Sequence, residues 1–203
     1  MKFTEQKKEK TLVIIKPDGV QRSLVGDIIK RIEKTGLKMT ALKFSVPTPE
    51  LISEHYQLEE GWLVKAGNKS LAAYKKKGIK PKEEDAEKIG RKVLKSLIKY
   101  MTSGPVVQMV WQGAHASQIV RKVVGSTEPL TSDVGTIRGD YVIDSYELAD
   151  LDERAVRNLI HASGNKEEAE KEINLWFKKE EIINYRLVQD QILYDVNLDG
   201  ILE

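Results

Sequence analysis

Residues 106–111 read Val-Val-Gln-Met-Val-Trp, and this run decides the fold. It has the length of one strand, and all its side chains except that of Gln108 are apolar. Side chains of a strand alternate between the two faces of a sheet, so a strand that is apolar throughout is typical of a sheet covered on both faces. The run therefore predicts a central strand, and the other elements are interpreted around it.

Three further segments predict strands. Residues 11–15 form a β-branched apolar run that ends in the turn sequence of residues 16–19, Lys-Pro-Asp-Gly. Residues 37–46 alternate apolar and polar side chains before Pro47, as in a half-buried strand. Tyr-Val-Ile at residues 141–143 predicts the fourth strand.

Apolar residues at helical spacing predict helices over residues 24–32, 48–56 and 115–124, and a last helix from Lys166 onward. Ser23 suits the N-cap of the first of these helices. The order of strands and helices is that of a split βαββαβ arrangement. We therefore predict an α+β fold with a four-stranded antiparallel sheet and helices packed on one face.

Composition limits the class of protein. A chain of 203 residues with 40% hydrophobic and 32% charged residues predicts one globular domain over residues 1–203. The absence of cysteine excludes disulfides, thiolate zinc sites and cysteine nucleophiles, and it permits a reducing compartment, so we expect the cytoplasm. The charged N-terminus has no apolar signal region and no stretch approaches the roughly 18 apolar residues of a membrane span, so we expect no membrane partner.

A lysine-rich segment lies in the middle of the chain, and we expect it to be helical. It has no acidic residue between Gly61 and Lys82 and contains Lys65, Lys69, Lys75, Lys76, Lys77, Lys80 and Lys82. Such a run can bind a polyanion, including nucleic acid, but without interleaved arginines and aromatics it more often solvates a helix face. The net charge of +2 does not by itself indicate nucleic acid.

The segment at residues 157–163, Arg-Asn-Leu-Ile-His-Ala-Ser, contains one of only three histidines. An imidazole can act as base, metal ligand or covalent phosphate carrier near neutral pH. Taken alone, a histidine after two aliphatic residues is more often a hydrogen-bonded residue at the edge of the core. Both interpretations of His161 stay open at this point.

Side chains that suit phosphates lie beside glycine-containing turns elsewhere in the chain. The glycine-rich loops G-x-x-x-x-G-K-[ST] and G-x-G-x-x-G are absent, so bound phosphates would have to meet side chains. Arginine forks and lysine charges suit phosphate oxygens. The candidates are Lys16, Arg121, Thr127 and Arg138.

Five ordered fragments together resemble the nucleoside diphosphate kinase family. They are Lys16-Pro-Asp-Gly-Val-Gln-Arg22, Glu54-His55-Tyr56, Tyr100-Met-Thr-Ser-Gly-Pro-Val-Val107, Gly135-Thr-Ile-Arg-Gly-Asp140 and Asn158-Leu-Ile-His161-Ala-Ser163. The resemblance covers about residues 11–177 with two interruptions.

This resemblance implies a ferredoxin-like fold and transfer of the γ-phosphate of a nucleoside triphosphate, typically ATP, to a nucleoside diphosphate. The implied mechanism is ping-pong through a phosphohistidine on His161, with low base specificity, and it would maintain nucleoside triphosphate pools. Mg²⁺ is implied as cofactor, held mainly by the nucleotide phosphates and not by protein ligands. A homo-oligomer built from dimers, a tetramer or hexamer, is also implied.

The resemblance assigns roles to named residues. By position, Ser163 and Glu172 match the pair that supports the histidine, and Lys16 and Tyr56 belong to the catalytic group. The matches to phosphate and sugar contacts are Lys16, Tyr56, Arg121, Thr127, Arg138 and Asn158.

The chain departs from the family pattern in three places. It is longer at about residues 61–95, where the aromatic that stacks on the base is replaced by Val93 or Leu94, and again at about residues 144–156. Ser163 is followed by Gly164 and not by aspartate, and Asn165 is expected to take over the capping of the next helix. These departures leave an alternative: a catalytically weak nucleotide- or polyanion-binding regulatory module on the same fold.

Overall fold

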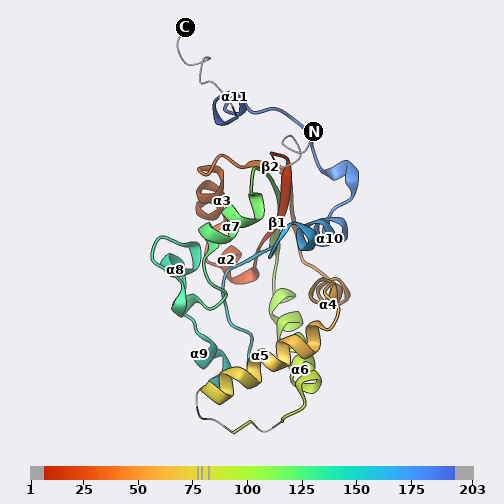
Figure 1. Cartoon of the computed structure of the whole chain (residues 1–203), viewed down its shortest axis with the longest axis vertical. Helices are drawn as coiled ribbons and strands as arrows, with labels where there is room; N and C mark the ends of the chain where they lie inside the picture. The colour runs from red at the N-terminus through yellow and green to blue at the C-terminus, as the bar shows by residue number, and fades with distance from the viewer. Residues whose placement is uncertain (1–6, 77, 79, 82, 195–203) are drawn as a thin grey trace.

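A four-stranded sheet forms the centre of the molecule in a computed structural model, which describes residues 7–76, 78, 80–81 and 83–194 (Figure 1). Its order is β2-β3-β1-β4. The strands are β1 Glu9–Ile15, β2 Lys38–Ser45, β3 Val106–Gly113 and β4 Ile160–Ala162. Every neighbouring pair is antiparallel, which confirms the predicted α+β class and the predicted sheet.

The central strands are buried on both faces. Val13 and Ile15 of β1 belong to one hydrophobic cluster, and Leu12 and Ile14 belong to a second cluster on the other face. This alternation follows from the two-residue period of a strand. Because both faces of β1 and β3 are apolar, helices have to cover both, and the prediction of helices on one face was wrong.

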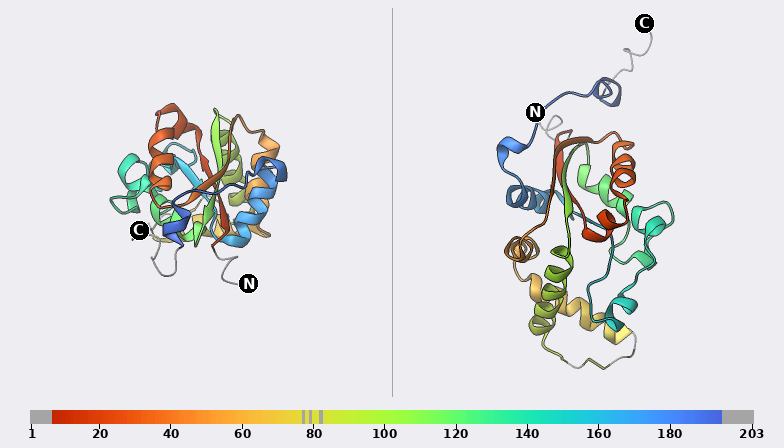
Figure 2. Two further views of the ribbon diagram at one scale, coloured as in Figure 1. Left: turned by 90° about the horizontal axis from the view of Figure 1, so that it is seen from above. Right: turned by 180° about the vertical axis from the view of Figure 1, so that it is seen from behind.

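Two helix layers therefore enclose the sheet, as Figure 2 shows from above. On the face of Val13, α3 Val25–Glu33 and α7 Ala116–Val124 contribute the buried residues. On the other face, α4 Pro49–Gln57 and α10 Lys166–Trp176 do so. The other described helices are α2 Pro17–Gln21, α5 Trp62–Lys76, α6 Ala86–Met101, α8 Ile137–Tyr141, α9 Tyr146–Leu151, α11 Asp190–Leu193 and the short 3-10 helices η1 Pro129–Thr131 and η2 Lys179–Glu181.

The fourth strand is not where the sequence predicted it. Tyr141 ends α8, and Ile143 is 95% exposed outside any strand. The fourth strand is β4, which has only three residues and carries His161. Ser23 is not the N-cap of α3 either, since that position belongs to Leu24 and Ser23 adopts a positive φ of 56°.

The predicted helical character of the lysine-rich segment is confirmed. Helices α5 and α6 pack against each other at the end of the molecule opposite α11 (Figure 1). Their backbones approach closely at two glycines, because a Cβ added at Gly67 or Gly90 would collide with the carbonyl group of Ala86 or Leu63. Lys77 and Lys82 of the lysine run lie outside the described residues. None of the helices that the structure describes is long and apolar enough to cross a membrane.

Substituting Gly90→Ala should destabilise the protein by about 1–3 kcal/mol, because the added methyl group must push α5 and α6 apart. The matched control is Gly26→Ala in α3, where an added Cβ meets nothing within 4 Å. That change should stabilise by about 0.5–1 kcal/mol through helix propensity. Urea unfolding of both variants measures the difference, and equal effects of the two substitutions would contradict the close packing.

Candidate active site

His161 is the middle residue of β4 and pairs with Ile14 of β1. Its Nε2 is buried and lies 2.8 Å from Oε1 of Glu172, which comes from α10. The imidazole side chain keeps 16% of its surface exposed, whereas that of Glu172 keeps 4%. Since Nε2 faces the carboxylate, Nδ1 is the ring nitrogen left for chemistry.

The second oxygen of Glu172 is also engaged. Ser163 Oγ donates to Glu172 Oε2 at 2.6 Å and accepts from the backbone N–H of Leu12 at 3.1 Å. Burial by itself would raise the pKa of Glu172, but the neighbouring His161 and His55 and the Ser163 hydroxyl hold it below its ordinary value. Glu172 therefore stays ionised beside the histidine.

A second histidine, His55 of α4, packs against the first. The ring centroids of His55 and His161 are 4.6 Å apart at an interplanar angle of 82°. Trp176 Nε1 donates to His55 Nδ1 at 3.2 Å, and burial, with a smaller effect of the neighbouring His161, lowers the pKa of His55 to about 3. His55 is thus neutral near pH 7, with its proton on Nε2. No role was assigned to His55 or Trp176 from the sequence.

These groups are close enough to suggest a metal site. Donor atoms of His55, His161 and Glu172 lie within 4.8 Å of one another. The lone pair of His55 Nδ1 is occupied by the Trp176 N–H, however, and Mg²⁺ prefers oxygen ligands. The three side chains therefore suit a polar cluster around Glu172 better than a site for Mg²⁺. Tyr56 is the next residue after His55 in α4, and the centroids of the two rings are 4.9 Å apart. Burial raises the pKa of Tyr56.

Lys16 and Asn158 form a buried polar pair at the end of β1. Lys16 Nζ donates to Asn158 Oδ1 at 2.7 Å, and Asn158 Nδ2 donates to the carbonyl of Thr127 at 2.9 Å. Burial first, and then the positive charge of Arg138, lower the pKa of Lys16 to about 7. Thr127 is exposed, and the atom that joins this network is its backbone carbonyl oxygen.

Arg138 is buried and binds backbone. Its guanidinium donates to the carbonyl oxygens of Gly125, Ser126, Asn158 and Ile160. Burial and the charge of Arg121 lower the pKa of Arg138 to about 10. Arg121 itself is exposed on α7.

The structure brings eight of the nine candidate residues together, in two adjoining groups: His161, Ser163, Glu172 and Tyr56 around β4 and α4, and Lys16, Asn158, Thr127 and Arg138 around the end of β1. The ninth, Arg121, lies one helical turn before Gly125, whose carbonyl accepts from Arg138.

Comparison with known proteins identifies the family. Residues 9–64 and 68–182 match the family described as nucleoside diphosphate kinase. The chain belongs to this family. A nucleoside diphosphate kinase of Pyrobaculum aerophilum is 52% identical over 179 residues, which cover 86% of this chain and 98% of that protein.

Solved structures agree with this family. A crystal structure of an NDP kinase from Pyrobaculum aerophilum superimposes with a TM-score of 0.84 at 50% identity and covers 87% of this chain and 100% of that one. A Borrelia burgdorferi nucleoside-diphosphate kinase with bound vanadate and ADP, a transition-state mimic, gives 0.74 at 34% identity, covering 91% and 96%. The chain is therefore a kinase that transfers phosphate between nucleotides.

Gly164, where the chain departs from the family pattern, lies against the carboxylate of Glu168. A Cβ at this position would collide with Oε2 of Glu168, and the Glu168 carboxylate accepts the N–H of Gly164. Asn165 caps α10 as expected, since its Oδ1 accepts from the N–H of Glu168 at 2.8 Å. Burial and the charge of Glu172 raise the pKa of Glu168.

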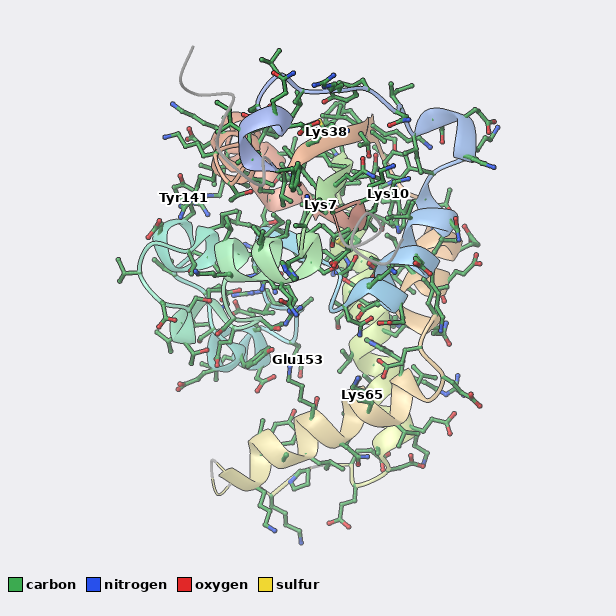
Figure 3. The ribbon with its side chains drawn as sticks, turned by 45° about the horizontal axis from the view of Figure 1, so that its top comes forward. Lys7, Lys10, Lys38, Lys65, Tyr141 and Glu153 are labelled. Carbon is green, nitrogen blue, oxygen red and sulfur yellow. The ribbon has the colours of Figure 1, made fainter. Side chains whose placement is uncertain are left out.

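The two segments in which the chain is longer than the family pattern, at about residues 61–95 and 144–156, contact each other. Lys69 Nζ of α5 lies 3.2 Å from the hydroxyl of Tyr146, the first residue of α9. Figure 3 shows Lys65 on the side of α5 that faces the rest of the molecule. The hydrogen bond and the charge of Glu59 raise the pKa of Lys65. Part of the charge of the lysine-rich helix is therefore engaged by other residues of the chain.

The lowered pKa of Lys16 predicts a pH dependence of stability. Below about pH 7 the native protein buries a charged amine, which is unfavourable. Between about 7 and 10.5 the unfolded chain binds more protons at Lys16 than the native protein does, so this group makes stability rise with pH. Lys16→Met should therefore exceed the wild type in stability by about 3–5 kcal/mol below this window and lose the advantage across it.

Urea unfolding at several pH values measures the two curves. Lys92→Met on the exposed face of α6 is the control, and its curve should run parallel to that of the wild type. A Lys16→Met curve parallel to the wild type would contradict the burial of a charged amine at this site.

Proposed function

We propose that His161 is the group that carries the phosphate between nucleotides. The observation that supports this most directly is the contact of its buried Nε2 with Glu172, which is in turn fixed by Ser163. A carboxylate on one ring nitrogen orients the imidazole and stabilises the positive charge that the ring acquires when the other nitrogen attacks. The arrangement leaves Nδ1 as the nucleophile.

The proposed reaction has two half-steps. Nδ1 of His161 attacks the γ-phosphorus, an N–P bond forms, and the bond to the bridging oxygen breaks, so the nucleoside diphosphate leaves with that electron pair. In the second half-step a terminal oxygen of another nucleoside diphosphate attacks the phosphohistidine and the N–P bond breaks. Because the transition state is loose, its outer oxygens need positioned cations more than a strong base, and Lys16, Arg121 and Arg138 are the candidates.

The proposed cofactor is Mg²⁺, which would neutralise charge on the phosphates. The ion would be held by the phosphates and not by the protein, because the described carboxylates beside the phosphate-binding residues already have other partners. Asp18 accepts from Tyr100 and from the N–H of Leu159, and Glu172 is engaged with Ser163 and His161.

The proposed substrates are nucleoside triphosphates and diphosphates with little discrimination of the base. Asn158, Thr127 and Tyr56 would contact sugar and phosphates, groups that all nucleotides share. A Halobacterium salinarum relative was solved with CDP and the Borrelia burgdorferi one with ADP, which supports a broad choice. We propose that the enzyme maintains nucleoside triphosphate pools in the cytoplasm. The chain would do so as a single domain with two insertions.

The polyanion-binding alternative receives less support from the same lysines. Lys65 binds both oxygens of Glu59, at 2.7 and 3.0 Å, and Lys69 contacts Tyr146. These contacts engage two of the seven lysines of the run within the chain.

We further propose a homo-oligomer built from dimers, with the β2 edge of the sheet as the dimer contact. β2 is an edge strand, and Leu42, Phe44 and Val46 are 50%, 62% and 61% exposed along it and just after it. An edge strand with exposed apolar side chains is a template for pairing with another chain. The first part of this edge is covered within the chain, where the N–H of Ile183 donates to Thr40.

Incubation with γ-labelled ATP and Mg²⁺ should label the wild type in an acid-labile form, and a chase with GDP should remove the label as GTP. His161→Ala should abolish the labelling. His115→Asn is the matched control, because His115 is exposed and has a positive φ of 54° that asparagine tolerates. Labelling that survives His161→Ala would remove this histidine from the mechanism.

Phe44→Asp should dissociate the dimer, because a charge would be buried in the contact. Light scattering during size exclusion should then show a smaller species than the wild type. Leu151→Asp, which places the same charge at a 75% exposed position of α9, should leave the oligomer intact. An unchanged mass for Phe44→Asp would exclude the β2 edge as the contact.

A further inference from the structure

The backbone makes an unusual turn two residues before His161. The N–H of Ile160 donates to the carbonyl of Asn158 at 2.7 Å, and Leu159 between them has a φ of +61°. A hydrogen bond across a single residue of positive φ defines a γ-turn, which is strained for any residue other than glycine. Leu159 is fully buried, so water cannot bind its backbone groups. Groups outside the turn have to hold it.

Two residues of the β1–α2 junction hold this turn. The N–H of Leu159 donates to Oδ2 of Asp18 at 3.2 Å, and the carbonyl of Leu159 accepts from the N–H of Lys16 at 2.7 Å. The backbone groups of the strained residue are thus both bound to a neighbouring segment. Strain of this kind persists only where the surroundings over-determine it.

Asp18 is itself fixed from a third element. Tyr100, near the end of α6, donates its hydroxyl to Oδ1 of Asp18 at 2.6 Å. The ring of the same tyrosine lies under the Lys16 ammonium, with Nζ 5.2 Å from the ring centroid. One carboxylate therefore connects α2, α6 and the turn that leads into β4.

We propose that Asp18, held by Tyr100, is a positioning residue for the phosphate carrier. Its carboxylate keeps the Leu159 turn in its strained form, and the turn sets how β4 presents His161 to Glu172 and to the phosphate-binding Lys16. The sequence suggested only a turn-forming role for this aspartate. The inference deepens the proposed function and rests on it, since it concerns the placement of the same nucleophile.

The turn also carries Asn158, whose side chain meets Lys16, so its release would move two parts of the site at once. A misplacement of about 1 Å at a reacting group can cost about 10²-fold in rate. Without the carboxylate, the Leu159 N–H would be left buried and unpaired and the turn would relax toward a negative φ. His161 would then lose its alignment even though the substitution removes none of the groups that His161 itself contacts.

The test is single-turnover formation of the acid-labile phosphoenzyme from γ-labelled ATP and Mg²⁺, expressed per site that binds ADP by calorimetric titration. Asp18→Ala should bind ADP at full stoichiometry and form the phosphoenzyme about 10²-fold more slowly than the wild type. Asp18→Asn keeps an oxygen that can accept from Leu159 and should recover the rate to within about tenfold of the wild type. Tyr100→Phe should fall between these two variants.

The matched control is Glu9→Ala at the opposite end of β1. Its carboxylate also accepts a backbone N–H from another element, that of Ser117 at 2.9 Å, but it lies away from the turn. This variant should form the phosphoenzyme within about twofold of the wild-type rate per site.

The outcomes separate the two proposals. No labelling of the wild type overturns the proposed function and the inference that rests on it. A labelled wild type with Asp18→Ala at the same rate per site overturns the positioning role alone, as does an equal loss in Glu9→Ala. If Asp18→Ala does not fold, a slow Tyr100→Phe beside a near-normal Asp18→Asn supports the role, and normal rates in both overturn it.

Discussion

The pairing of the short strand β4 with β1 is the constraint on which the active site depends. It places His161 opposite Ile14, on the face of the sheet that α10 covers, so that Glu172 can reach the ring. A slip of one residue would turn every side chain of β4 to the other face and separate the histidine from its carboxylate. Three residue pairs alone would specify this register weakly. Just beyond the strand, Leu12 and Ser163 exchange hydrogen bonds, which links the register of the sheet to the same hydroxyl that fixes Glu172.

Charged groups buried around this strand differ in how well the protein replaces their lost water. Arg138 donates to four carbonyl oxygens and Glu172 accepts from Ser163, so both remain charged near neutral pH. Lys16 has Asn158 as its hydrogen-bond acceptor and the face of Tyr100, and burial lowers its pKa to about 7. A buried ammonium with few acceptors is stabilised by an incoming anion. An anion beside Lys16, at the point where β1 enters α2, would therefore stabilise the charged form of this side chain.

Long patterned segments could be predicted from the sequence, and short or cooperative features could not. The apolar runs of β1 and β3 and the helices α4, α7 and α10 have local signals that packing reinforces. β4 has three residues, too few for a periodic pattern, and its pairing is specified by contacts with β1 that are distant in sequence. The apolar residues 141–143 resembled a strand more closely, yet they pair with none of the four strands and Ile143 stays exposed. The apolar faces of β1 and β3 already indicated two helix layers, which the predicted arrangement did not use.

Residues that act through other residues were the hardest to identify in the site. His55 stands in a fragment that carried the family resemblance, but its contact with His161 depends on how α4 packs against the sheet. Gly164 is a second residue whose surroundings could not be identified from the motif alone. The missing side chain at this position suggests a lost carboxylate when the motif is considered alone, whereas Glu168, one helical turn later, occupies that space and accepts the Gly164 N–H. Because residues four apart in the first turn of a helix can reach the loop before it, a group lost from a motif can be supplied by the following helix. The three-dimensional surroundings of His161 are therefore a better guide to its chemistry than the residues that follow it in the sequence.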